Sequence, residues 1–89
     1  MTKEQQEAEL LKYYRIYTAP WKLFKKHYPP TDIEEFWNSL REDSRELVGQ
    51  YPEQERLITD LILATNNEII RIQKRGEEPW NNEQNQSKA

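Results

Sequence analysis

Side chains that could perform acid–base or metal chemistry are few and scattered in this sequence. His27 is the only histidine, and there is no cysteine. Lys25 and Lys26 precede His27, and their charge would repel a cation. No Glu-x-x-His pair is present for a di-metal bundle, and Gly49 and Gly76 are too far apart to form a phosphate loop. The sequence therefore predicts a protein that is not an enzyme and holds no metal or cofactor, with His27 as an exposed or capping side chain.

Carboxylates are concentrated between residues 29 and 60, where nine acids stand against three arginines. On an amphipathic helix, acids at this density usually form the solvated face. They could also present spaced negative charge to a basic groove, as an acidic inhibitor of a nucleic-acid-processing protein would. The candidate partner-binding residues of this acidic face are Asp32, Glu35, Glu42, Asp43 and Glu46.

Positive charge gathers in residues 12–28, which contain five basic residues, no acid and six aromatic residues. This combination supplies phosphate attraction and stacking surfaces, as a sequence-tolerant nucleic-acid binder requires. The helical spacing of the aromatics favours burial of most of them in a core, with the lysines facing outward. Five basic residues on a chain of net charge −3 are also weak evidence for nucleic-acid binding. Nucleic-acid binding is therefore the alternative function, with Lys12, Arg15, Lys22, Lys25 and Lys26 as candidate contacts.

One predicted long helix, residues 53–75, organises the rest of the chain. Its apolar residues recur at spacings of three and four: Ile58, Leu61, Ile62, Thr65, Ile69 and Ile72. Further apolar residues flank this stripe, which favours either a central helix or one shared with a second copy. The candidate self-association residues are Leu57, Leu61, Leu63 and Ile70. The pair Asn66-Asn67 could break the helix, but the stripe keeps its phase across it, which favours continuity.

Two further helices, one long and one short, are expected in the N-terminal part. The first covers residues 2–18 and stops at Pro20, because the ring cannot donate to the helical ladder and disfavours helix in the preceding residue. The second covers residues 20–27, with the proline in its first turn, where the missing N–H costs nothing. The sequence Tyr28-Pro29-Pro30 then predicts an extended elbow.

A third helix is expected over residues 32–48. Thr31 and Glu34 have the spacing of a capping box at its start. Gly49 is placed to close it as a left-handed residue, and Gly76 is placed in the same way after the last helix. The short connections favour antiparallel packing of neighbouring helices.

The predicted fold class is all-α: a small antiparallel helical bundle of three long helices and one short helix. Residues 1–76 form one domain, and residues 77–89 form a polar, disordered tail with Trp80 as its anchor. The lack of cysteine, of an apolar N-terminal segment and of any long apolar run predicts a cytoplasmic protein that does not enter a membrane.

The composition thus favours a small non-catalytic protein that binds another protein through its helical faces, and self-association into a homodimer stays open.

Overall fold

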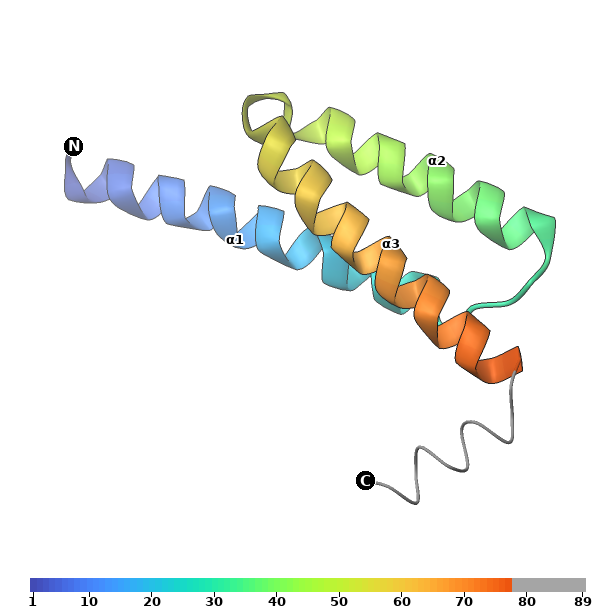
Figure 1. Ribbon diagram of the computed structural model, residues 1–89. Coiled ribbons are helices and arrows are strands. Elements are labelled where there is room, and N and C mark those ends of the chain that lie inside the picture. Colours follow the sequence, from blue (N-terminus) through green and yellow to red (C-terminus); the bar gives the residue numbers. More distant parts are fainter. Residues whose placement is uncertain (78–89) are drawn as a thin grey trace, which may run out of the picture.

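The computed structural model describes residues 1–77 and confirms the predicted all-α class. In this part of the chain there are three α-helices and no strand: α1 (Lys3–Lys26), α2 (Glu34–Gln50) and α3 (Glu55–Glu77), with a 3-10 turn η1 (Pro52–Gln54) before α3 (Figure 1). None of these helices is long and apolar enough to cross a membrane. Of the predicted tail, residues 78–89 with Trp80 lie outside the described residues.

Helix α1 runs without interruption through Pro20, so the predicted stop at this proline and the separate helix over 20–27 are wrong. A proline inside a helix removes one hydrogen bond and costs about 3 kcal/mol. Pro20 is nevertheless buried, on the same side of α1 as Ile16, Ala19 and Leu23. Burial of this apolar face offsets the local cost, which the sequence pattern alone did not show.

The predicted ends of α2 are also wrong. Ile33 is the N-cap and contributes no side-chain cap, while the Thr31 hydroxyl accepts a 3.4 Å hydrogen bond from the Ile33 N–H. The helix begins too late for Thr31 to cap it, and the Thr31 hydroxyl instead makes a local contact with the N–H two residues further on. At the other end, Gly49 stays inside the helix without a positive φ, and the Tyr51 N–H bonds the Val48 carbonyl at 3.2 Å.

Helix α3 is continuous across Asn66 and Asn67, as the phase of its apolar stripe indicated. Asn66 Nδ2 donates a 3.1 Å hydrogen bond to Ser44 Oγ on α2, and Ser44 Oγ donates to the Leu40 carbonyl at 2.7 Å. The side-chain amide of Asn66 thus forms a hydrogen bond to a neighbouring helix instead of competing for the backbone of its own helix. Gly76, predicted to end this helix, lies within it.

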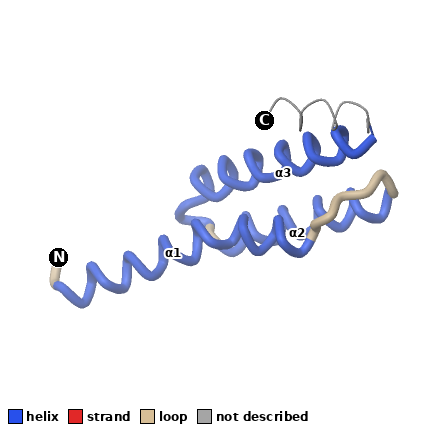
Figure 2. Tube along the Cα trace, turned by 90° about the horizontal axis from the view of Figure 1, so that it is seen from below, coloured by secondary structure: helices blue, strands red, loops and turns tan. Residues whose placement is uncertain are grey.

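The chain reverses direction from α1 to α2 and again from α2 to α3, so that α1 and α3 run the same general way (Figures 1 and 2). Helix α1 packs mainly on α3 and less on α2. The core is small and takes residues from all three helices: Ile16, Ala19, Leu23, Leu40, Ile58, Ile62 and Ile69.

The molecule is elongated and thin, measuring 56 × 32 × 18 Å along its principal axes. The first turns of α1 extend beyond the ends of α2 and α3 (Figures 1 and 2). Residues 1–11 are all exposed. This projecting part of α1 is capped rather than frayed, because Thr2 and Gln5 form a reciprocal capping box.

Candidate interaction surface

The most exposed large apolar side chains of α1 form a single line, which we call the α1 ridge: Leu10, Tyr14, Tyr17 and Trp21. Their exposed fractions are 70, 65, 58 and 58 %. Spacings of four, three and four residues put all of them on one face of the helix. Beyond Trp21 the line continues in stacked rings, since Phe24 lies 6.1 Å from Trp21 and 5.6 Å from Tyr28 between ring centroids.

Helix α1 therefore carries two apolar faces, and its own chain covers one of them. Ile16, Leu23 and His27 form the buried face. With about 100° of rotation per residue, the α1 ridge lies roughly 140° around the helix from this face. The prediction that most aromatics of residues 12–28 are buried in the core is wrong, because Tyr14, Tyr17 and Trp21 lie on the face of α1 that α2 and α3 do not cover.

The five candidate nucleic-acid contacts divide into paired and unpaired cations. Lys12 Nζ lies 2.9 Å from Glu53 Oε2, and Lys26 Nζ lies 2.8 Å from Asp43 Oδ2. The pKa of Glu53 is lowered by the hydrogen bond and charge of Lys12, and the pKa of Lys26 is raised by its hydrogen bond to Asp43. Arg15, Lys22 and Lys25 are exposed and form no ion pair with any described residue.

Within residues 1–77, the candidate residues of the acidic face also divide into unpaired and paired side chains. Asp32, Glu35, Glu42 and Glu46 are exposed, whereas Asp43 is turned toward α1. Between α1 and α2 an open groove of about 410 Å³ is lined on one side by Arg15 and Lys22 and on the other by Glu46. Part of the basic segment and part of the acidic segment thus face one another across this open groove, where their charges attract one another.

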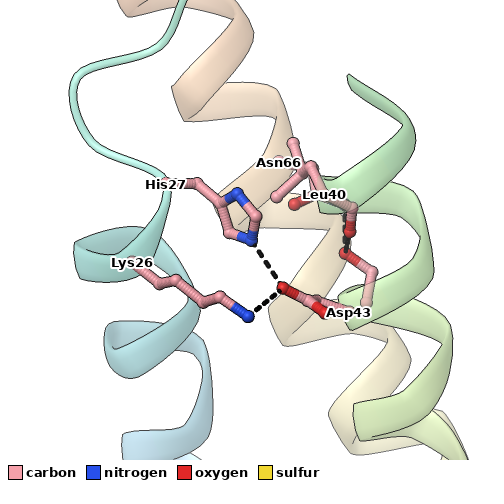
Figure 3. Close-up of polar contacts among 6 residues, drawn as sticks. Lys26, His27, Leu40, Asp43 and Asn66 are labelled. Carbon is pink, nitrogen blue, oxygen red and sulfur yellow. Dashed lines mark hydrogen bonds and ion pairs between the residues drawn. The ribbon is translucent and has the colours of Figure 1, made fainter. Parts of the chain in front are cut away.

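His27 is buried, with 6 % of its surface exposed, and it is the C-cap residue of α1, so of its two predicted positions the exposed one is wrong. Its backbone N–H caps α1 by bonding the Leu23 carbonyl at 3.2 Å, and its ring meets the edge of Phe36. Nε2 lies 2.8 Å from Asp43 Oδ2 (Figure 3). The spacing from Ile16 to Leu23 to His27, seven and then four residues, is a signal that could have placed the ring on the buried face.

The polar cluster around His27 joins α1 to α2 and α2 to α3. The hydroxyl of Ser44, the residue after Asp43, is hydrogen-bonded to the Leu40 carbonyl and to the Asn66 side chain. Among residues 1–77, no three His, Asp or Glu side chains are placed to hold a metal ion. The pKa of Asp43 is lowered, first by the hydrogen bond from Lys26 and then by that from His27, which suits a charged structural acceptor.

The four candidate self-association residues of α3 do not share one surface. Leu57 and Leu61 pack against the core and are half-buried. Leu63 and Ile70 are 54 and 37 % exposed, and their spacing of seven residues puts them on one line, well over 100° around α3 from the other two. They offer two isolated apolar side chains instead of a continuous patch.

Comparison with known proteins adds no relative. No family model, no curated protein and no solved structure matches this chain. Among the described residues, the α1 ridge is the largest line of exposed apolar side chains on one helix.

Proposed function

We propose that this protein is a non-catalytic interaction module that binds a protein chain through the α1 ridge. The observation that carries the proposal is the line of four large apolar side chains, each more than half exposed, on a helix whose other apolar face is already buried. A contiguous apolar patch of this kind on a small folded protein is typical of an interaction site. Tyrosine and tryptophan are also the residues that most often dominate binding energy in protein interfaces.

The acidic residues support a role for charge in partner choice. Glu35, Glu42 and Glu46 have spacings of seven and four residues on α2, so they share one exposed line. We propose that this line, with Asp32, contributes to the selection of a basic partner, as in an acidic inhibitor of a nucleic-acid-processing protein. Its effect is expected mainly in the association rate and in salt dependence.

Site-directed photo-crosslinking in the cells that normally produce the protein tests the proposal. A photoreactive residue at Tyr17 should capture a protein chain, which mass spectrometry then identifies. The same residue at Arg41, exposed on α2 and away from the ridge, serves as the control. Failure of Tyr17 to crosslink above the Arg41 control would exclude the α1 ridge as the contact.

Nucleic-acid binding is the second candidate, favoured by the unpaired cations beside exposed rings. Lys22 and Lys25 lie within the four residues that follow Trp21 on α1, next to the exposed rings of the ridge. Binding of a single-stranded oligonucleotide, followed by fluorescence anisotropy, should weaken steeply from low to physiological salt. The substitution of Lys22 and Lys25 by glutamate should weaken it further, while Arg41→Glu should have less effect. Absence of binding at low salt would exclude this candidate.

A further inference from the structure

We infer that the partner on the α1 ridge is a second copy of this chain, with the two α1 helices packed antiparallel about a two-fold axis between Tyr14 and Tyr17. This inference rests on the proposed function and names the occupant of the same surface.

The spacing of the ridge is the same in both directions along the helix. From Leu10 to Trp21 the intervals are four, three and four residues. A two-fold axis between Tyr14 and Tyr17 therefore sets Leu10 against Trp21 of the second copy, and Tyr14 against its Tyr17. Each side chain of the ridge finds an apolar partner, as an isologous interface requires. These alternating intervals are also those of side chains that interlock between paired helices.

The charges along one edge of the ridge select the antiparallel direction. Glu4 and Glu7 lie near the start of α1, and Lys22 and Lys25 lie near its end. Each acid is eighteen residues from one of the lysines, which is five helical turns, so the four side chains share one edge of the ridge.

All four of these side chains are exposed and unpaired within residues 1–77. In an antiparallel pair the same edges of the two helices meet. Glu7 of one copy then lies between Lys22 and Lys25 of the other. A parallel pair would set this charged edge against the opposite edge of the second helix, so the acids and the lysines would not meet.

The projecting part of α1 supplies the reach that this pairing needs. It extends beyond α2 and α3, and its residues up to Leu11 are exposed (Figure 1). In the dimer it lies along the second copy's α1 near Trp21, and the second copy's projecting part does the same in return. The exposed surface of the ridge alone amounts to about 500 Å² per copy, using typical aromatic and leucine areas. That is more than half of the roughly 800 Å² per partner in a stable interface, before the edges are added.

Sedimentation equilibrium of the purified 89-residue chain over a range of concentrations tests the inference. The wild type should reach the mass of a dimer. Tyr17→Glu should raise the dissociation constant by about tenfold or more, because it buries like charges near the two-fold axis. Leu63→Glu is the matched control, an exposed leucine of α3 changed in the same way, and it should leave the dimer intact. Circular dichroism of both variants establishes that the helices are retained.

A charge exchange tests the direction of packing. Changing Lys22 and Lys25 to glutamate should weaken the dimer, and adding Glu4→Lys and Glu7→Lys to that variant should restore it. A wild type that stays monomeric, a dimer that tolerates Tyr17→Glu, or a failure of the restoration would each overturn the inference. If the purified chain is monomeric while crosslinking from Tyr17 captures a different protein, the proposed function stands and the second copy is excluded as the partner.

Discussion

Asp43 Oδ2 accepts hydrogen bonds from both His27 Nε2 and Lys26 Nζ, each at 2.8 Å. An ionised carboxylate can only accept, so Nε2 carries the proton in this contact. The two donors come from the end of α1 and the acceptor from the middle of α2, so one carboxylate fixes how these helices meet (Figure 3). His27 is the buried member, which makes the bond structurally important even though Lys26 is exposed.

The first prediction concerns removal of this acceptor. Asp43→Ala should lower the free energy of unfolding by about 1–3 kcal/mol, because it leaves a buried imidazole N–H without a partner. Glu42→Ala, a change to the neighbouring exposed acid, should have little effect. Urea unfolding followed by circular dichroism measures both variants. Equal stability of the two would show that the His27 contact contributes nothing to the fold.

The pH dependence of stability follows from the lowered pKa of Asp43. Because this carboxyl holds its proton less tightly in the folded state, its contribution is present above its ordinary pKa of 3.8 and is lost as pH falls through the lower folded value. Unfolding free energies of the wild type and Asp43→Asn, measured from neutral pH downward, should therefore converge below about pH 4. A difference that stays constant through this range would contradict the assigned cause.

Substitutions on the two sides of α3 should differ sharply. Ile58 is fully buried, so Ile58→Ala should cost about 2–5 kcal/mol of unfolding free energy through lost burial and an unfilled cavity. Leu63 is exposed on another side of the helix, and Leu63→Ala should change stability by less than about 0.5 kcal/mol. Chemical denaturation at one protein concentration gives both values. Comparable losses would mean that Leu63 is buried in solution, which would point to α3 as an interface.

Gly49 offers a stabilising substitution. It lies within α2, it has no positive φ, and a Cβ atom there would meet open space. Gly49→Ala should raise the free energy of unfolding by about 0.5–1 kcal/mol, because alanine loses less backbone entropy in a helix. Thermal unfolding at fixed protein concentration measures the change. A lower melting temperature would instead support the left-handed helix end that the sequence predicted for this glycine.

Periodic patterns predicted the features that depend on a long repeat. The stripe through Ile58, Ile62 and Ile69 identified the buried side of α3, and its constant phase favoured an unbroken helix across Asn66. Many side chains contribute to such a pattern, so no single contact can overturn it. Single-residue signals are less reliable: Thr31 and Pro20 each predict a helix boundary, and neither is one.

The sequence by itself determined that the chain is helical, which side of α3 is buried, and where opposite charges gather along the chain. Tertiary structure decided that Pro20 lies inside a helix and that His27 is buried and hydrogen-bonded to Asp43. It also decided that the side chains of Tyr14, Tyr17 and Trp21 are exposed. The physical reason is that the periodicity of a helix shows which of its faces are apolar. Burial depends instead on how many of those faces the neighbouring helices can cover. In α1 two faces are apolar, and α2 and α3 cover one of them.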